Sequence, residues 1–387
     1  MLWINFLHFY QPANIEKDKI AEATKRSYER IIRALEEHPE IKFTMNISGC
    51  LVLRWSEEFH YIKLINRIKI LIERGQIELT GSAAYHPLLP LIPLNEAEKQ
   101  IKTNEKILKK YFGNKLKLRG FFFPEMAINK ETAVLIKKLG YSWIIIDEIS
   151  KNGKLNQVDF NKKYLEQTSN LKVVFRNRQY SESYVPETVL NLIKNNNESL
   201  VISASDAELY GLRHIDHVAD FEKLLKTPGL KTLTISNFLN TIKSTKKFNL
   251  VSASWQSSEQ ELKNQQPFIL WTDKNNKIHK KLWQLANIAQ NLNTNHDSDQ
   301  NASWSRWHLV RGLASCMFWW ASAKDFSQVF GPIAWNPDEI EKGVNELIRS
   351  IRSLEQSTDL QTKLMAEKLT FEIKNLIWEK HWRTHKK

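Results

Sequence analysis

Residues 118–129 read LRGFFFPEMAIN, and this short stretch indicates the class of fold. Three consecutive phenylalanines before a proline are typical of a short strand that is buried on both faces, as in parallel sheets. Glu125 follows the proline directly, so the strand ends on a carboxylate. A carboxylate held there is either a nucleophile or proton donor of an enzyme, or an ordinary acid at the start of the next helix.

Similar apolar runs recur through the first 240 residues and alternate with helical patterns. Asn95 with Glu98 resembles a capping box, and Gly75 closes the helix expected to end at Arg74. This alternation of strand and helix, repeated about seven times, favours a parallel barrel or a doubly wound sheet. The strands expected from the sequence are 3–7, 42–47, 76–80, 118–123, 142–147, 172–176, 200–205 and 231–235.

Beyond residue 240 the strand signals fade. Apolar residues keep helical spacing in 278–288 and again in 344–354. We therefore expect an α/β domain over residues 1–270, followed by an α-helical domain over residues 271–387.

The composition is that of an ordinary globular protein, with 42% hydrophobic and 26% charged residues among 387. A formal net charge of +13 raises the possibility of nucleic-acid binding. The basic residues, however, are mostly interleaved with apolar ones at helical spacing, which is typical of the solvated faces of helices. We expect no nucleic-acid partner.

The chain carries no signal of export or of membrane insertion. Cys50 and Cys316 are its only cysteines, too few for a disulfide framework. The N-terminus MLWINFLHFYQP lacks a basic region and a continuous apolar run, so it is neither a signal peptide nor an anchor. We expect a cytoplasmic location without membrane contact, and the sequence leaves the oligomeric state open.

Polar residues gather where several of the expected strands end. A parallel barrel has its active site at the carboxyl ends of its strands, so these residues are candidates for one site. Glu125 and Asp206 follow different strands and suit a reaction that needs a nucleophile and a proton donor. A donor near Glu125 is expected, from Arg119, Arg176 or His8. The candidates are His8, Tyr10 and Gln11; Glu78, Tyr85 and His86; Glu125; and Asp206, Glu208 and His214.

Five stretches in order resemble the signature regions of glycoside hydrolase family 57. They are LHFYQP (7–12), GQIELTG (75–81), GFFFPEMAIN (120–129), SASDAELYGLRH (203–214) and RGLASCMFWWAS (311–322). The resemblance implies an incomplete parallel (β/α)7 barrel followed by a C-terminal helical bundle. It also implies that Glu125 is the nucleophile and Asp206 the general acid/base of a retaining enzyme acting on α-glucans or malto-oligosaccharides, by hydrolysis or by 4-α-glucanotransfer.

The resemblance suggests the remaining roles as well. Trp319 and Trp320 lie in the fifth region, and one of them is expected to stack on a sugar ring. The other polar candidates, His8, Tyr10, Gln11, Glu78, His86, Glu208 and His214, are expected to bind substrate. No cofactor is implied, and no metal is expected, because His214 and His217 have ligand spacing but no evident third ligand.

Two departures from the family pattern keep other readings open. Tyr10 stands where many members have histidine, and Ala207 stands where glycine often follows the aspartate. A catalytically idle carbohydrate-binding protein would fit these changes. A metal-dependent polysaccharide deacetylase on a related barrel is the other alternative.

Overall fold

The computed structural model describes residues 1–196, 199–324, 333–355 and 360–385. The chain divides into two compact units. The first comprises Met1–Ala84 and Leu89–Asn264, and the second comprises Tyr85–Leu88 and Gln265–Lys387. A four-residue piece of the N-terminal half therefore belongs to the helical unit.

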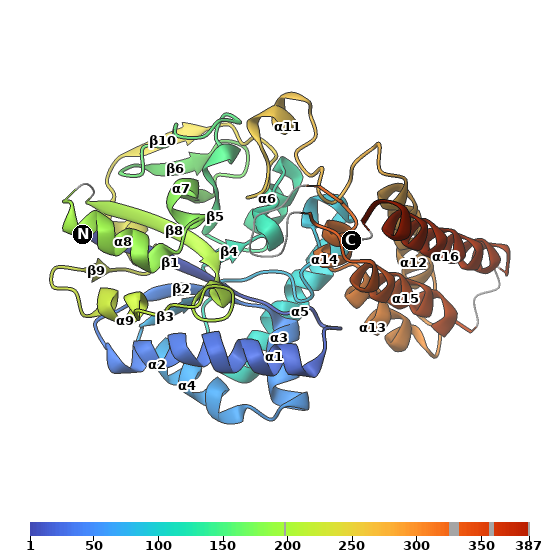
Figure 1. Ribbon diagram of the computed structural model, residues 1–387, viewed down its shortest axis with the longest axis horizontal. Coiled ribbons are helices and arrows are strands. Elements are labelled where there is room, and N and C mark those ends of the chain that lie inside the picture. Colours follow the sequence, from blue (N-terminus) through green and yellow to red (C-terminus); the bar gives the residue numbers. More distant parts are fainter. Residues whose placement is uncertain (197–198, 325–332, 356–359, 386–387) are drawn as a thin grey trace. The chain divides into compact units, whose positions relative to one another are not determined.

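The first unit is α/β and contains two sheets (Figure 1). One sheet has the order β3-β2-β1-β8, and all of its neighbouring strands are parallel. Every residue of β2 and all but the first of β1 are buried, as expected for parallel strands covered on both faces. The strands are β1 (Leu2–Phe9), β2 (Phe43–Ile47), β3 (Ile77–Leu79), β8 (Leu200–Asp206) and β9 (Lys231–Thr232), which pairs with the start of β1.

The second sheet has the order β10-β6-β7-β5-β4. Only the β6–β7 pair is antiparallel. The sequence did not indicate β6 or β10, because β6 has only two apolar residues and three of the four residues of β10 are exposed. Its strands are β4 (Gly120–Phe122), β5 (Trp143–Asp147), β6 (Lys163–Glu166), β7 (Lys172–Arg176) and β10 (Thr245–Phe248).

The strand expected at 231–235 is wrong beyond Thr232. The side chain of Thr234 accepts a hydrogen bond from the backbone N–H of Asn237 and so caps helix α10 (Ile235–Thr241). A threonine at the N-cap stabilises a helix start, which here outweighs the β-branched composition of the segment.

The two sheets of the first unit are joined by backbone hydrogen bonds and share a core. Between β3 and β4, the N–H of Gly81 donates to Gly120 O and the N–H of Phe122 donates to Gly81 O, both at 2.9 Å. Between β7 and β8, the N–H of Asn177 donates to Ile202 O, also at 2.9 Å. Side chains from β1, β4, β5, β7 and β8 meet in one buried cluster that includes Ile4, Phe6, Phe122, Ile145, Val174 and Ile202.

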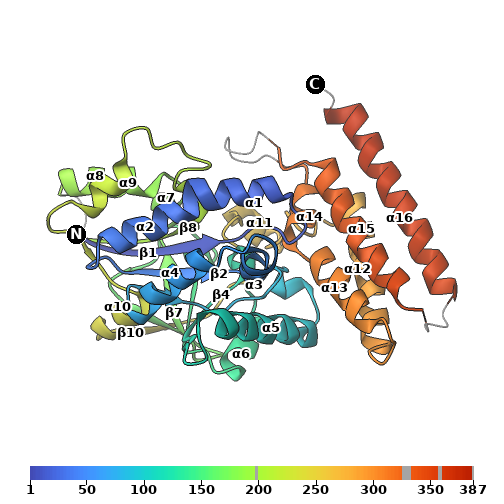
Figure 2. The same ribbon diagram turned by 90° about the horizontal axis from the view of Figure 1, so that it is seen from below.

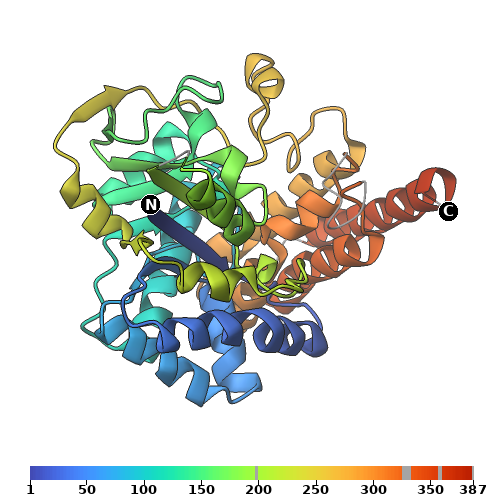
Figure 3. The ribbon, with the colours of Figure 1, turned by 60° about the vertical axis from the view of Figure 1, so that its left-hand side comes forward.

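Helices pack around these sheets. Helix α2 contacts α4, and α8 contacts α9. Figures 2 and 3 show the helices of this unit on the outside of its strands. The helices of the first unit are α1 (Lys17–Ala23), α2 (Glu29–Glu37), α3 (Gly49–Leu53), α4 (Ile62–Glu73), α5 (Leu94–Phe112), α6 (Lys130–Lys138), α7 (Arg178–Ser181), α8 (Val185–Lys194), α9 (Asp220–Leu225), α10 and α11 (Glu259–Lys263).

The second unit is helical. Helix α15 (Pro337–Ser353) packs against α12 (Lys277–Asn295), α13 (Ala302–Gly312), α14 (Ser315–Trp320) and α16 (Leu360–Lys380). The apolar residues at 344–354 line the buried face of α15, as their spacing predicts. Within the described ranges, no helix has the length and apolarity to cross a membrane.

Candidate active site

The carboxyl ends of β1, β2 and β8 bring three polar side chains into register. His8 on β1 lies opposite Asn46 on β2 and opposite Asp206 on β8. The His8 Nδ1 and Asn46 Oδ1 atoms are 2.8 Å apart. Parallel pairing therefore places His8 next to Asp206 although 198 positions of sequence separate them.

The imidazole of His8 is neutral at neutral pH. Burial lowers the pKa of His8 to about 4, and the charge of Asp206 and the hydrogen bond to Asn46 only partly offset this effect. A neutral ring that bonds the Asn46 oxygen through Nδ1 carries its proton on Nδ1. Its Nε2 atom then carries a lone pair and acts as an acceptor.

Glu125 lies in a strained turn directly after β4. Its backbone φ is +59° and that of Met126 is +48°, a left-handed conformation that is uncommon for residues other than glycine. Pro124 begins this short turn, and the three phenylalanines before it are fully buried. The carboxylate is therefore presented by a rigid, apolar strand end.

Trp255 holds Glu125 through two hydrogen bonds. The indole Nε1 donates to Glu125 Oε2 at 2.9 Å, and the Trp255 backbone N–H donates to Glu125 O at 3.1 Å. A hydrogen bond to an ionised carboxylate stabilises its charged form. The Trp255 indole is therefore one donor to this carboxylate, and the donor expected from Arg119, Arg176 or His8 remains a prediction.

Aromatic contacts connect the surroundings of Glu125 with those of Asp206. The ring of His8 lies 6.3 Å from that of Trp255, edge to face, and 4.6 Å from that of Phe122. Phe122 and Trp255 are 5.9 Å apart. Asp206, His8, Trp255 and Glu125 therefore follow one another within one contiguous cluster of the first unit.

Asp206 and Glu208 differ in exposure and in partners. The Asp206 side chain is 27% exposed, and its Oδ2 accepts from Arg213 Nη1 at 2.9 Å. Glu208 is buried, and its Oε1 accepts from Gln11 Nε2 at 2.7 Å and from the hydroxyl of Tyr28. Burial raises the pKa of Glu208 to about 7; Arg213 opposes this effect and Asp206 adds to it.

Tyr10 and His214 take different positions. The ring of Tyr10 is stacked on His8 with centroids 5.7 Å apart, so it lies in the same cluster. His214 stacks on Tyr184 at 3.9 Å instead. Asp216, two positions after His214, is ion-paired to Arg30 at 2.7 Å. In the described part of the chain, no three His, Cys, Asp or Glu side chains are grouped as metal ligands.

Glu78 does not lie with this cluster. It pairs with Thr44, two positions before Asn46 on β2, and accepts hydrogen bonds from the backbone N–H of Ser236 at 3.0 Å and from the Ser236 hydroxyl. Burial raises its pKa. Glu78 and Arg119 also line a cavity of about 670 Å³ at the start of β3 and β4.

Three candidates belong to the second unit. His86 has a φ of +58°, and its Nδ1 lies 2.9 Å from Ser315 Oγ. The rings of Trp319 and Trp320 are 4.4 Å apart at an angle of 66°. Their sugar-binding role remains a prediction.

Sequence reasoning missed several residues of the cluster. Neither Trp255, which donates to Glu125, nor Tyr28, which donates to Glu208, is among the candidates that the motifs indicate. Asp147 ends β5 and is fully buried, so the rule applied to the other strand ends would have identified it. No sequence signal pairs Trp255 with Glu125, since 130 positions separate them.

Comparisons with known proteins agree with the resemblance seen in the motifs. The family model of glycosyl hydrolase family 57 matches residues 5–251. An α-amylase of Pyrococcus horikoshii is 31% identical over 150 residues, which are 38% of this chain and 23% of that protein. A 4-α-glucanotransferase of Thermococcus litoralis is 31% identical over 150 residues, which are 38% of this chain and 22% of that protein. The matched part is thus less than a quarter of each relative's length.

Solved structures share the fold over most of the chain. The 4-α-glucanotransferase from Thermococcus litoralis superposes with a TM-score of 0.69 at 17% identity, covering 92% of this chain and 60% of that one. A branching enzyme from Thermococcus kodakaraensis gives 0.70 at 13% identity, covering 95% and 94%. Because the family model matches residues 5–251, which are more than half of this chain, the chain belongs to glycosyl hydrolase family 57.

Proposed function

We propose that this chain is a retaining enzyme that acts on α-1,4-linked glucans, with Glu125 as the nucleophile and Asp206 as the general acid/base. The observation that carries the proposal is the cluster in which Asp206, His8, Trp255 and Glu125 follow one another. Two carboxylates at the ends of different strands are what a double displacement requires.

The proposed first step forms a glycosyl-enzyme ester. A Glu125 oxygen attacks the anomeric carbon from one face, and the glycosidic C–O bond breaks with its electron pair moving to the leaving oxygen. Asp206 gives its proton to that oxygen. Such a step needs the two carboxyl groups at about 5 to 5.5 Å from each other.

The proposed second step releases the sugar with its original configuration. Asp206, now ionised, takes a proton from an incoming hydroxyl group, whose oxygen attacks the anomeric carbon and displaces Glu125. If that hydroxyl belongs to water the reaction is hydrolysis, and if it belongs to a second glucan the reaction is transfer. The relatives named above include an α-amylase and a 4-α-glucanotransferase, and we propose one of these two activities for this chain.

The surrounding polar groups suit the binding of sugar hydroxyls. We propose that neutral His8 and Tyr10, whose rings are stacked on each other, border the same sugar subsite. Gln11 is proposed to fix the carboxyl group of Glu208, to which it donates. We keep Glu78 and His214 as proposed binding residues, and His86, Trp319 and Trp320 as those of the second unit.

The arrangement of strands supports a finer statement about the fold. The hydrogen bonds that join β3 to β4 and β7 to β8 support a proposed incomplete seven-stranded barrel formed by β1, β2, β3, β4, β5, β7 and β8. We propose that residues 1–270 form this catalytic domain and residues 271–387 a helical bundle. Neither cysteine is in a disulfide, which suits the proposed cytoplasmic location.

The test is to incubate the protein with maltoheptaose and to resolve the products by chain length. Products both shorter and longer than maltoheptaose indicate transfer, and shorter products alone indicate hydrolysis. Glu125→Gln and Asp206→Asn should both abolish turnover of maltoheptaose.

A second substrate, α-maltosyl fluoride, separates the two roles. Fluoride leaves without a proton, so Asp206→Asn should still release one equivalent of fluoride per enzyme, whereas Glu125→Gln should release none. Full turnover of both substrates by Glu125→Gln would refute the proposal. Glucan binding without turnover by the unaltered protein would favour an idle carbohydrate-binding protein instead.

A further inference from the structure

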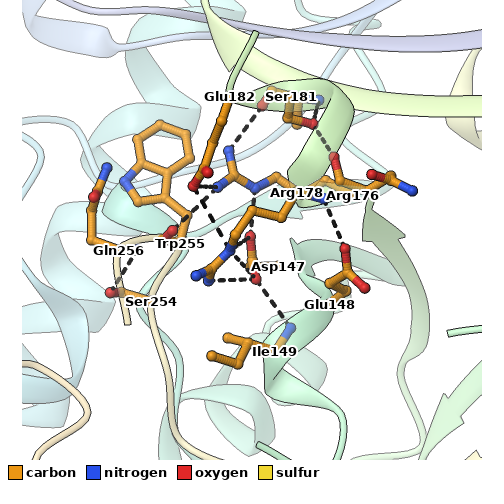
Figure 4. Close-up of polar contacts among 12 residues, drawn as sticks. Asp147, Glu148, Ile149, Arg176, Arg178, Ser181, Glu182, Ser254, Trp255 and Gln256 are labelled. Carbon is orange, nitrogen blue, oxygen red and sulfur yellow. Dashed lines mark hydrogen bonds and ion pairs between the residues drawn. The ribbon is translucent and has the colours of Figure 1, made fainter. Parts of the chain in front are cut away.

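A buried cluster of three charged side chains lies at the carboxyl ends of β5 and β7 (Figure 4). Asp147, which ends β5, is fully buried and pairs in register with Arg176, which ends β7. Its Oδ2 accepts from Arg176 Nε at 2.6 Å, and its Oδ1 accepts from Arg178 Nη2 at 2.7 Å. One buried carboxylate therefore accepts from two guanidinium groups that are themselves largely buried, and the exposed carboxylate of Glu182 lies 3.9 Å from each of them.

The arginines direct their remaining donors at backbone carbonyls. Arg176 donates through Nη2 to Trp255 O at 3.2 Å, and Arg178 donates through Nη1 to Ser257 O at 2.7 Å. The guanidinium of Arg176 also lies 5.2 Å from the centre of the Trp255 ring. The loop that carries Trp255 is therefore held at two of its backbone carbonyls, those of Trp255 and Ser257.

The same loop contacts the turn that carries Glu125. Ala253 and Ile128 exchange two backbone hydrogen bonds, and the Trp255 N–H and indole both donate to Glu125. The guanidinium of Arg176 also donates through Nη1 to Ala204 O on strand β8 at 3.1 Å. Ala204 precedes Asp206 by two positions on β8. A single guanidinium thus bonds the loop that holds Glu125 and the strand that ends on Asp206.

We infer that Asp147, Arg176 and Arg178 form a positioning assembly that sets the Trp255 indole against the carboxylate of Glu125 for the reaction. The inference rests on the proposed function, since it assigns the cluster to the proposed nucleophile. Arg176 and Arg178 are positioning residues, because Trp255 is the residue that touches Glu125.

The chemistry of the cluster explains why it would hold this geometry tightly. A buried guanidinium without a counter-charge is strongly unfavourable, so both arginines remain fixed on Asp147. The planar fork of arginine also fixes the direction of the donors left over for Trp255 O and Ser257 O. Rates of enzymatic steps fall steeply when a reacting group is displaced by about 1 Å.

The test measures the step that Glu125 would carry out. With α-maltosyl fluoride, kcat and KM are determined for Trp255→Phe, Asp147→Asn and the double variant. Phenylalanine removes the indole donor, and asparagine keeps the shape of Asp147 without its charge. Each single variant should lower kcat roughly 10- to 100-fold, the expected effect of losing a hydrogen bond to a charged group, with KM changed less than about twofold.

The double variant distinguishes positioning from general stability. If Asp147 acts through the indole, the double variant is no slower than Trp255→Phe alone, because the contact has already been lost. Arg178→Lys gives a milder change should Asp147→Asn fail to fold. Arg67→Lys is the matched control, since Arg67 forms a two-pronged pair with Glu36 between α2 and α4. It should leave kcat unchanged.

Three outcomes would overturn the inference while the proposed function stands. Multiplied losses in the double variant would mean that Asp147 acts independently of the indole. A kcat unchanged in Trp255→Phe would mean that the indole does not assist Glu125. A loss of kcat in Arg67→Lys as large as that in Asp147→Asn would mean that breaking any ion pair lowers kcat, by lowering the fraction of folded protein. Failure of the proposed function itself is recognised separately, as full activity of Glu125→Gln.

Discussion

Replacement of His8 by glutamine should make the stability of the first unit less sensitive to acid. The pKa of His8 is about 4 in the folded protein because the ring is buried, against about 6.5 in an unfolded chain. Below pH 6.5 the unfolded chain binds a proton that the folded protein does not. Stability is therefore fully present above pH 6.5 and is lost progressively as the pH falls towards 4.

The size of this loss follows from the two pKa values. Their separation corresponds to about 3 kcal/mol once the pH is well below 4, at about 1.4 kcal/mol for each pH unit. Between pH 7 and pH 4.5, the part lost through His8 is about 2 kcal/mol. Glutamine has no charge to gain, so His8→Gln should lack this component whatever its stability at pH 7.

The assay is urea unfolding followed by fluorescence at pH 7 and at pH 4.5. The difference in unfolding free energy between the two pH values should be about 2 kcal/mol smaller in His8→Gln than in the unaltered protein. His217→Gln, at an exposed position, is the control for loss of a histidine as such. An equal acid dependence in His8→Gln and the unaltered protein would refute the assignment of a neutral, buried imidazole beside Asp206.

Two further substitutions test other parts of the first unit. Burial raises the folded pKa of Glu208 to about 7, so the stability that its protonated form contributes is present below pH 4.5 and is lost as the pH rises through 7. In the unaltered protein the unfolding free energy should therefore fall by an amount on the order of 3 kcal/mol through Glu208 between pH 4.5 and pH 8. Urea unfolding at the two pH values should show that Glu208→Gln lacks this fall. A methyl group on Gly120 would lie 2.1 Å from Trp143 Cζ2, so Gly120→Ala should cost about 1 to 3 kcal/mol of unfolding free energy. Gly75→Ala meets open space and should cost only the strain of its φ of +71°; equal costs for the two glycines would contradict the packing argument.

The sequence predicted best those strands whose buried residues follow one another directly in the chain. The run at 118–123 contains β4, and the run at 172–176 has the same bounds as β7, because their residues are apolar over consecutive positions. The strand β6 was missed because only two of its four residues, Tyr164 and Leu165, are apolar, and β10 was missed because three of its four residues are exposed. The two strands pair with each other across about 80 positions of sequence.

The sequence predicted some residues of the candidate site but not their position along each strand. The rule that polar groups gather at strand ends selected His8, Glu125 and Asp206, and these now follow one another through Trp255. The same rule cannot tell how far along a strand a side chain lies. Glu78 satisfies the motif, yet its register with Thr44 sets it two positions back from the level of Asn46.

The backbone of Glu125 shows why the donor could not be read from the motif. A glycine would adopt a φ of +59° without strain, but it would carry no carboxylate; for glutamate, such a conformation costs about 1 kcal/mol or more. The two hydrogen bonds from Trp255, each worth about 1 kcal/mol or more, are enough to offset that cost. Because the loop that supplies them lies 130 positions away, the conformation of Glu125 depends on tertiary contacts and not on the FFFPEM stretch itself. The strain and its compensation are therefore one property of the folded cluster, and loss of the Trp255 indole should affect the turn as well as the carboxylate.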